Sequence, residues 1–419
     1  MNDEMRNNRP KTVIGKLNLT VGQCVGDLQG CDDKVLQAGV DYLHRLGGGI
    51  LNVLPGIYQM HNALYIPSHV TVRGAGSETV LKKEPSFSST LILDSDWYEA
   101  QVRVSDVRGF RPGCGVMLRA YKDDRLMHVV QATVTAIEGD VLLLDQRLLK
   151  NFWVADRATV ATLFPVITAK AGTGDVRVEN LILDGNWAQN EEINGNYSGA
   201  VFIQECDRFT FCQVTARNYH GDGFSFQVCD DIHFEKCRAE NNESRGFHPG
   251  SGSQRPIFDQ CEAIGNTQGI FFCWGVSDGL VKDSVCSQNH HYGISIGHRD
   301  TDNHIVNTHI EQNGRVGVLF REPTTDFRGG HRNTFVDCVI QDNGSDVSGI
   351  GVDIRGLTCN VTICNCNIAD SGQGKQTVGV RIAPEVVDLQ LDGNHFGGHK
   401  KDIEDERLDL APHLEVSHE

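Results

Sequence analysis

Apolar and mixed positions alternate in short units that each begin with a glycine. The glycines of the regular units are Gly199, Gly223, Gly246, Gly269, Gly293 and Gly317, and looser copies begin at Gly351 and Gly379. Successive regular units start 23 or 24 residues apart. A fixed period of this length predicts a repeat architecture in which every unit buries one face against its neighbours.

Each unit contains a short strand after its glycine. The residues one and three positions after the glycine are apolar in nearly every unit, beginning with Ala200 and Phe202, whereas the residue between them is mixed. This period of two predicts two inward side chains with one outward side chain between them.

A second strand in each unit adds two further columns. A column of small side chains contains Cys212, Cys237, Cys261, Cys338 and Cys364, with Ser284 and Thr308 in the gaps, and a column of amides contains Asn242, Asn266, Asn289, Asn313 and Asn343. Free cysteines pack as small apolar residues, and stacked amides satisfy backbone groups at a turn. We therefore predict buried, reduced cysteines and a structural asparagine ladder.

Units of about 24 residues with short strands and no helical stretch close into coils of a parallel β-solenoid. From residue 22 to about 400 the chain resembles the right-handed parallel β-helix proteins of the pectin-lyase-like superfamily. The stretch that contains "LPGIY" and "VTVRGAG" is similar to the opening of many such proteins. Within it, Asp32 and Asp33 favour a helix start. The apolar side of this helix would cover the open end of the solenoid, and consists of Val35, Leu36, Leu43 and Leu46.

The expected fold class is all-β: a right-handed parallel β-helix with an N-terminal capping helix and a small inserted β subdomain. The segment 87–164 breaks the repeat and alternates as a β insertion does, as in "QVRVSDV". The expected division is a cap with the first coils, the insertion, the main β-helix, and a C-terminal coil and tail, over residues 1–86, 87–164, 165–400 and 401–419.

Composition limits the classes of partner that we expect this protein to bind. A net charge of -17 disfavours nucleic acid, which requires basic side chains against its phosphates, although a local basic groove can still bind an anionic substrate. No apolar run approaches the roughly 18 residues that span a membrane. The start "MNDEMRNNRPK" has no apolar core of a signal peptide. We expect a cytoplasmic chain as given, with export of a longer precursor left open; the oligomeric state is not predicted.

Polar and charged side chains gather at the strand ends of the units from Gly223 to Gly317. Equivalent positions on adjacent coils lie about 4.8 Å apart, so Trp274, His298 and Glu322 should stack on successive coils. His298 should also come within reach of Glu322 or Asp300. The candidate catalytic residues are His298, His248, Arg321, Glu322 and Asp300, and the candidate substrate-binding residues are Trp274, Arg245, Arg299, Asp222, Asp302, Asn303, Asp353 and Arg355.

Three functions fit this cluster. A polysaccharide lyase needs a base and a cation beside a uronate carboxylate, which His248 or His298 and Arg321, with Arg299 or Arg245, would supply. A glycoside hydrolase needs a carboxylate pair, drawn from the aspartates and Glu322. A non-catalytic β-helix would only hold a glycan in its groove. The predominance of His and Arg favours the lyase on an acidic poly- or oligosaccharide.

Two motif comparisons refine this prediction. Mannuronan epimerases resemble one another around "YGFDPH", whereas the nearest stretch here is "RGFHPG", with His248 in place of the aspartate. The motifs "HPGSGS", "FFCWGV" and "VLFRE" are similar to those of an uncharacterised bacterial β-helix group.

The turn "DTDN" lacks the glycine and the spaced carboxylates of a complete calcium loop. No cofactor is therefore predicted, and calcium stays an alternative.

Overall fold

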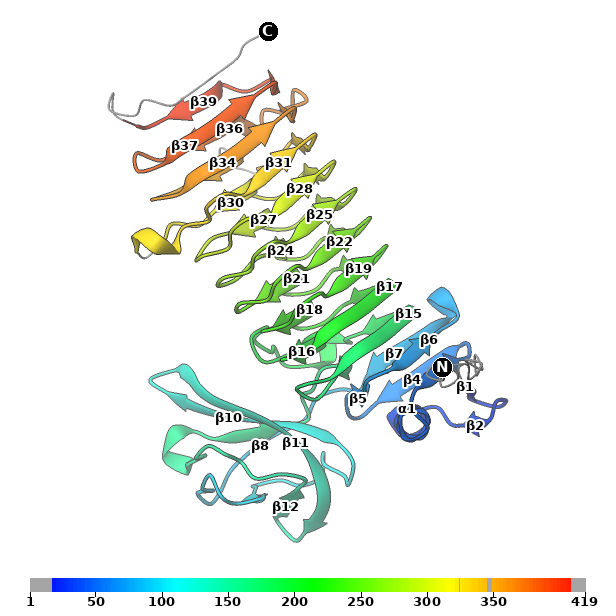
Figure 1. Cartoon of the computed structure of the whole chain (residues 1–419). Helices are drawn as coiled ribbons and strands as arrows, with labels where there is room; N and C mark the ends of the chain where they lie inside the picture. The colour runs from blue at the N-terminus through cyan, green and yellow to red at the C-terminus, as the bar shows by residue number, and fades with distance from the viewer. Residues whose placement is uncertain (1–16, 324, 345–348, 408–419) are drawn as a thin grey trace, which may run out of the picture.

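A single α-helix caps a long β-solenoid in the computed structural model, which describes residues 17–323, 325–344 and 349–407 (Figure 1). The helix α1 spans Asp33–Arg45, and the side chain of Asp32 accepts a hydrogen bond from the backbone N–H of Lys34, as an N-cap does. Leu36 and Leu43 are buried as predicted. Leu46 is 58% exposed, because it lies at the C-cap where the helix has ended. No helix in the described ranges has the length and apolar character to cross a membrane.

Two parallel sheets form the solenoid walls. The larger has 22 strands: β1 (Leu17–Gly22), β2 (Leu28–Gln29), β3 (Gly49–Val53), β4 (Gly56–Met60), β6 (Val70–Arg73), β7 (Thr79–Lys83), β15 (Gly174–Asp184), β17 (Asp207–Arg217), β19 (His233–Glu235), β20 (Arg238–Glu240), β22 (Ile257–Asp259), β23 (Glu262–Ile264), β25 (Leu280–Lys282), β26 (Val285–Ser287), β28 (His304–Val306), β29 (His309–Glu311), β31 (Thr334–Val336), β32 (Val339–Gln341), β34 (Cys359–Cys364), β35 (Asn367–Ala369), β37 (Val387–Asp392) and β38 (His395–Gly397).

The second sheet carries the strands that follow the repeating glycines. Its 11 strands are β5 (Leu64–Tyr65), β14 (Ile167–Thr168), β16 (Gly199–Gln204), β18 (Asp222–Gln227), β21 (Arg245–Gly250), β24 (Gln268–Phe271), β27 (Tyr292–Ile296), β30 (Val316–Phe320), β33 (Gly349–Ile354), β36 (Gln376–Ile382) and β39 (Lys401–Asp405). Four single turns of 3-10 helix interrupt the described loops, at Gly76–Glu78, Val154–Asp156, Trp187–Gln189 and Asp326–Arg328.

Stacked inward rings fill the space between the walls. Phe224 lies 5.0 Å from Phe247, centroid to centroid, and Phe234 lies 5.3 Å from Phe258, each pair nearly parallel. The first unit departs from the predicted register, because Val201, not Ala200, pairs with Phe224. Gly199 pairs with Asp222 rather than Gly223, so the inward residues of this unit are Val201 and Ile203.

The asparagine ladder forms as predicted. Each amide from Asn242 to Asn313 donates to the side-chain oxygen of the next asparagine, and Asn343 donates to Gln376. A backbone carbonyl accepts a second hydrogen bond from each amide. The ladder therefore ties adjacent coils together through a buried turn.

The small-residue column is correct for its middle members and wrong at its ends. Cys237, Cys261 and Cys338 are buried, and each thiol donates to a carbonyl of the preceding coil. Cys212 pairs with Glu235 and Cys364 with Val336, so both lie two residues too early for the column. Val214 and Cys366 occupy those positions, since they come two residues later. All 14 cysteines are free.

The segment between β7 and β14 forms a six-stranded antiparallel sheet. Its strands are β8 (Ser88–Thr90), β9 (Gln101–Arg103), β10 (Gly115–Lys122), β11 (Arg125–Glu138), β12 (Val141–Leu144) and β13 (Thr159–Ala161). It has a hydrophobic cluster of its own, which includes Val102, Leu118, Leu142 and Val160. In Figure 1 it projects from the end of the solenoid that carries α1.

Candidate functional site

The site lies on the outward face of the 11-stranded sheet. Two positions after their glycines, β18, β21, β24 and β27 place Ser225, His248, Phe271 and Ser295 in one outward row. This row is the mixed column of the sequence. Ser225, His248 and Ser295 are nevertheless buried, because a preceding loop and two arginine side chains cover this part of the wall.

Asp222 and His248 form a buried hydrogen-bonded pair. The Nδ1 atom of His248 lies 2.6 Å from Oδ2 of Asp222, and His248 is 1% exposed. Oδ1 of Asp222 accepts from the backbone N–H of Arg245 at 3.0 Å, and the Arg245 guanidinium lies 3.6 Å away. The carboxylate therefore fixes the proton of the ring on Nδ1. The other ring nitrogen, Nε2, is buried and has no hydrogen-bond partner in the described ranges of the chain.

The charges of this pair follow from its surroundings. Burial lowers the pKa of His248 below its ordinary value, and the attraction of Asp222 only partly opposes this effect. Burial acts to raise the pKa of Asp222, but His248 and Arg245 outweigh it and hold that pKa below its ordinary value. Because both pKa values are lowered, the Asp222 carboxylate is ionised and the His248 imidazole is neutral at pH 7.

A glycine loop closes over the carboxylate. Ser225 Oγ donates to the carbonyl of Gly195 at 2.6 Å. A Cβ atom on Gly195 would lie 1.7 Å from Oδ2 of Asp222, so only glycine allows this approach. The sequence around Gly195 gave no signal of this role, because the loop falls outside the repeat.

Two arginines pack against Phe271 beside the pair. The guanidinium carbons of Arg245 and Arg321 lie 4.3 Å and 4.2 Å from the centre of the Phe271 ring, within the range of a cation–π contact. The His248 ring lies 5.4 Å from Phe271. Phe271, Ser225 and Ser295 were not among the predicted site residues, although their common column was visible in the repeat.

Asp300 anchors Arg321 from below the surface. Arg321 donates to Ser295 Oγ and to the Phe272 carbonyl, each at 2.7 Å, and its guanidinium lies 3.2 Å from Oδ2 of Asp300. Asp300 is fully buried and also accepts from the backbone N–H groups of Gly275, Val276 and Gly297. Burial raises the pKa of Asp300 to about 6, in spite of these partners. The carboxylate thus positions the arginine and presents no surface to a ligand.

His298 and Trp274 lie next to this centre at the strand ends. Their rings are 5.4 Å apart and inclined at 36°, so these two residues are neighbours on successive coils as predicted. Partial burial, then Arg321 and Arg328, lower the pKa of His298. No hydrogen bond or ion pair joins His298 to Glu322 or Asp300 in the described part of the chain, contrary to expectation. Glu322 is exposed, and the Asp300 carboxylate turns inward to backbone donors.

The other predicted site residues are dispersed. Asp353 is buried between Arg355 (2.6 Å) and Arg381 (3.0 Å), farther along the same sheet. Asp302 pairs with Arg332, and Arg299 is exposed. Asn303 is fully buried and donates to Asn333 and to the Val276 carbonyl. It belongs to a second amide ladder inside the wall, and its role in substrate binding stays a prediction.

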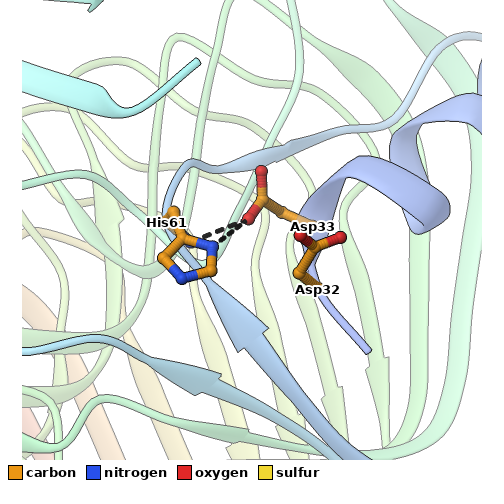
Figure 2. A group of neighbouring side chains, drawn as sticks. All are labelled: Asp32, Asp33 and His61. Atoms are coloured by element: carbon orange, nitrogen blue, oxygen red, sulfur yellow. Dashed lines mark hydrogen bonds and ion pairs between the residues drawn. The ribbon is translucent and has the colours of Figure 1, made fainter. Parts of the chain in front are cut away.

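The structure also brings together Asp32, Asp33 and His61 at the cap, where no site was predicted (Figure 2). Their potential metal-ligand atoms lie within 4.8 Å of one another. Oδ1 of Asp33 accepts from both the ring and the backbone N–H of His61, and Asp32 caps α1. Burial raises the pKa of Asp33 to about 6. These bonds explain the cluster as a structural tie between the helix and the first coils.

Comparisons with known proteins agree with this architecture. A family model described as a right-handed beta helix region matches residues 172–329. The comparison with curated proteins finds no match. Among solved structures, the chain is similar to the A-module of the Azotobacter vinelandii mannuronan C-5 epimerase AlgE6, at 18% identity, with 92% of this chain and 93% of that chain covered and a TM-score of 0.58.

Two further structures have the same fold. The A-module of the Azotobacter vinelandii epimerase AlgE4 is 16% identical, with 92% and 96% covered and a TM-score of 0.58. ORF18 of Geobacillus virus E2 is 11% identical, with 89% and 61% covered and a TM-score of 0.50. At these identities the likeness concerns the fold, and the chain is a right-handed parallel β-helix.

Proposed function

We propose that this right-handed parallel β-helix acts on an acidic polysaccharide or oligosaccharide and cleaves it by β-elimination. The observation that carries the proposal is the Asp222–His248 pair, which fixes one ring nitrogen and leaves Nε2 without a partner among the described residues, beside two arginines. A neutral imidazole with an unused lone pair is a general base. The fold similarity to the mannuronan C-5 epimerase modules is consistent with a uronate substrate.

In the proposed reaction, His248 Nε2 takes the proton from the carbon beside the uronate carboxylate. The electron pair forms the new carbon–carbon double bond, the glycosidic carbon–oxygen bond breaks, and water protonates the leaving oxygen. Asp222 keeps the Nδ1 proton in place and stabilises the imidazolium that forms. Its own pKa is lowered, so it stays ionised throughout.

Arg321 and Arg245 would stabilise the charge that develops on the substrate carboxylate. Arg321 has five N–H donors, of which Ser295, Phe272 and Asp300 engage three. Within the part of the chain that the structure describes, its Nε has no hydrogen-bond partner. His248 is 1% exposed, so substrate reaches Nε2 when a guanidinium leaves Phe271 for the carboxylate. Binding the anion and uncovering the base are then one movement.

A glycoside hydrolase is a weaker interpretation. It needs two carboxylates on either side of the scissile bond. Asp222, Asp300 and Asp353 are all fully buried, and each already pairs with a histidine or an arginine. A binding-only protein would not need an oriented histidine with a free nitrogen.

A screen of uronate polymers with three readouts tests the proposal. The ultraviolet absorbance of unsaturated ends reports elimination, release of reducing ends reports any cleavage, and retention on immobilised polymer reports binding. We expect absorbance and reducing ends to rise together. Reducing ends without absorbance would establish the hydrolase, and retention without either signal would establish the binding-only protein.

A further inference from the structure

A cavity of about 190 Å³ opens between the inserted sheet and the loop before β16. The inserted sheet contributes Met117, Arg119, Tyr121, Leu126 and Val129, and the loop contributes Glu192, Ile193, Asn194 and Tyr197. This volume is about that of six water molecules in the liquid, which suits one sugar ring.

Strand periodicity explains why the insertion has an unfilled face. On β10 the alternate residues Val116, Leu118 and Ala120 join the hydrophobic cluster of the insertion. The alternate set, Met117, Arg119 and Tyr121, points to the other face, which lines the cavity. On β11, Val129 pairs with Arg119 and Leu126 with Tyr121, which widens the same face.

The cavity combines an apolar surface with a buried donor. Tyr121 and Tyr197 offer aromatic rings, and Met117, Leu126 and Val129 add apolar side chains. Arg119 is 9% exposed and its guanidinium lies 2.5 Å from Glu191, and its Nε is buried without a hydrogen-bond partner among the residues that the structure describes. A sugar has an apolar ring face, which can pack on aromatic side chains, and hydroxyl groups, which can form hydrogen bonds. Buried hydrogen-bond donors in proteins normally have a partner.

One loop connects this cavity to the Asp222–His248 pair. Ile193 and Asn194 line the cavity, and the next residue, Gly195, covers the Asp222 carboxylate. The backbone N–H of Ile193 donates to the carbonyl of His220, two residues before Asp222, at 2.8 Å. On the insertion side, Gln131 of β11 donates to the carbonyl of Tyr197. A bound chain that passes over this loop would reach both sites.

We propose that this cavity binds one sugar unit of the same polymer, outside the unit at His248. The ring of that unit packs on the tyrosines, and its hydroxyls face the Arg119 side chain that lines the cavity. The inference rests on the proposed function for the identity of the polymer. The insertion then selects for chains long enough to occupy both sites.

Filling the cavity tests the inference. In the full chain, Val129→Trp places a large side chain in the cavity, and Met127→Trp is the matched control, because Met127 is on the same strand but 47% exposed and outside the cavity. Size-defined mannuronate, guluronate and galacturonate oligosaccharides serve as probes. We expect Val129→Trp to lower kcat/KM about tenfold for long oligosaccharides and to leave the shortest cleaved ones unchanged, with Met127→Trp like the parent. Leu126→Trp replaces Val129→Trp if the latter loses the circular dichroism of the parent.

The other outcomes separate the two proposals. If Val129→Trp changes kcat/KM equally for all oligosaccharide lengths, or for none, the second sugar site is overturned. The elimination mechanism is not affected by either result. If the parent cleaves none of the probes, saturation-transfer NMR with the same oligosaccharides decides. Binding that Val129→Trp abolishes would uphold the sugar site while refuting the lyase, and no such binding would overturn the sugar site too.

Discussion

Replacing Asp222 by asparagine changes a single atom next to the candidate base. Oδ1 of Asp222 accepts from the backbone N–H of Arg245 at 3.0 Å and faces its guanidinium. An asparagine must keep its one oxygen there, because an amide N–H₂ cannot accept. The amide nitrogen then occupies the position of Oδ2, 2.6 Å from Nδ1 of His248. It can only donate, so the ring proton moves to Nε2 and the lone pair for proton abstraction is lost.

The expected loss follows from the value of a positioned base. Proton transfer by such a group contributes about 10²–10⁴-fold in rate, or about 3–5 kcal/mol of transition-state stabilisation. The variant should lose about 1–3 kcal/mol of folding free energy through its disturbed buried hydrogen bonds. A domain with about 5–15 kcal/mol of stability remains folded at 25 °C after that loss, so unfolding would not explain the drop in turnover.

The assay is kcat/KM on the polymer that the screen identifies, followed by the absorbance of unsaturated ends. Asp184→Asn is the matched control, since Asp184 is also buried and pairs with an arginine, Arg217, at 3.0 Å. We expect Asp184→Asn to keep the parent rate within about twofold, as the loss of a pair outside the site should. Full activity of Asp222→Asn with unchanged pH dependence would refute the orienting role of Asp222.

Four further predictions concern the supporting structure. The folded-state pKa of Asp300 is raised from 3.8 to about 6, so the folded protein holds this proton more tightly than the unfolded chain does, and the resulting stabilisation is present below pH 4 and is lost as pH rises through 6. The unfolding free energy of the parent relative to Asp300→Asn should therefore fall by about 2 kcal/mol between pH 4 and pH 6, and by about 3 kcal/mol between pH 3 and pH 7. Chemical denaturation that shows a constant difference across this range would contradict the prediction. Arg321→Ala should abolish most turnover and lower stability by about 3–5 kcal/mol, because it leaves the Asp300 carboxylate buried without this cation; an unchanged thermal midpoint would show that the pair does not matter to the fold. Phe272→Ala should cost about 3–5 kcal/mol in a denaturant titration, since Phe272 is fully buried, whereas a loss below about 1 kcal/mol would place it outside the core. Thiol titration of denatured, unreduced protein should count 14 reactive cysteines, and a count of only a few would mean that disulfides form.

The coil geometry was predictable because one repeat constrains every strand. The proximity of Trp274 to His298 and the asparagine ladder both follow from lateral spacing between coils, and both are present. The same logic failed at Gly199 and Cys364, where a shift of one or two residues moves a side chain into another row. At these two positions the residue type matches that of the column, but the residue lies in a different row of the sheet.

The remaining contacts of the site could not be predicted from the sequence repeat. Gly195 reaches Asp222 from a loop outside the repeat. Phe271 occupies an outward position with an apolar ring, which in sequence is typical of core packing, and its contacts with Arg245 and Arg321 give it a place in the site. Asp300 follows a left-handed turn at His298 and Arg299 that points its carboxylate inward. Such reversals are set by local backbone conformation, which the alternation of side chains does not determine.

The most direct test of the account compares the parent chain with His248→Gln on uronate polymers, with the absorbance of unsaturated ends and the release of reducing ends measured in the same samples. The glutamine offers no basic nitrogen at the position of Nε2. We predict that absorbance and reducing ends rise together for the parent and that both fall by at least about 10²-fold for His248→Gln. Elimination that persists in His248→Gln, or cleavage by the parent without absorbance, would contradict the assignment of His248 as the base of a β-elimination.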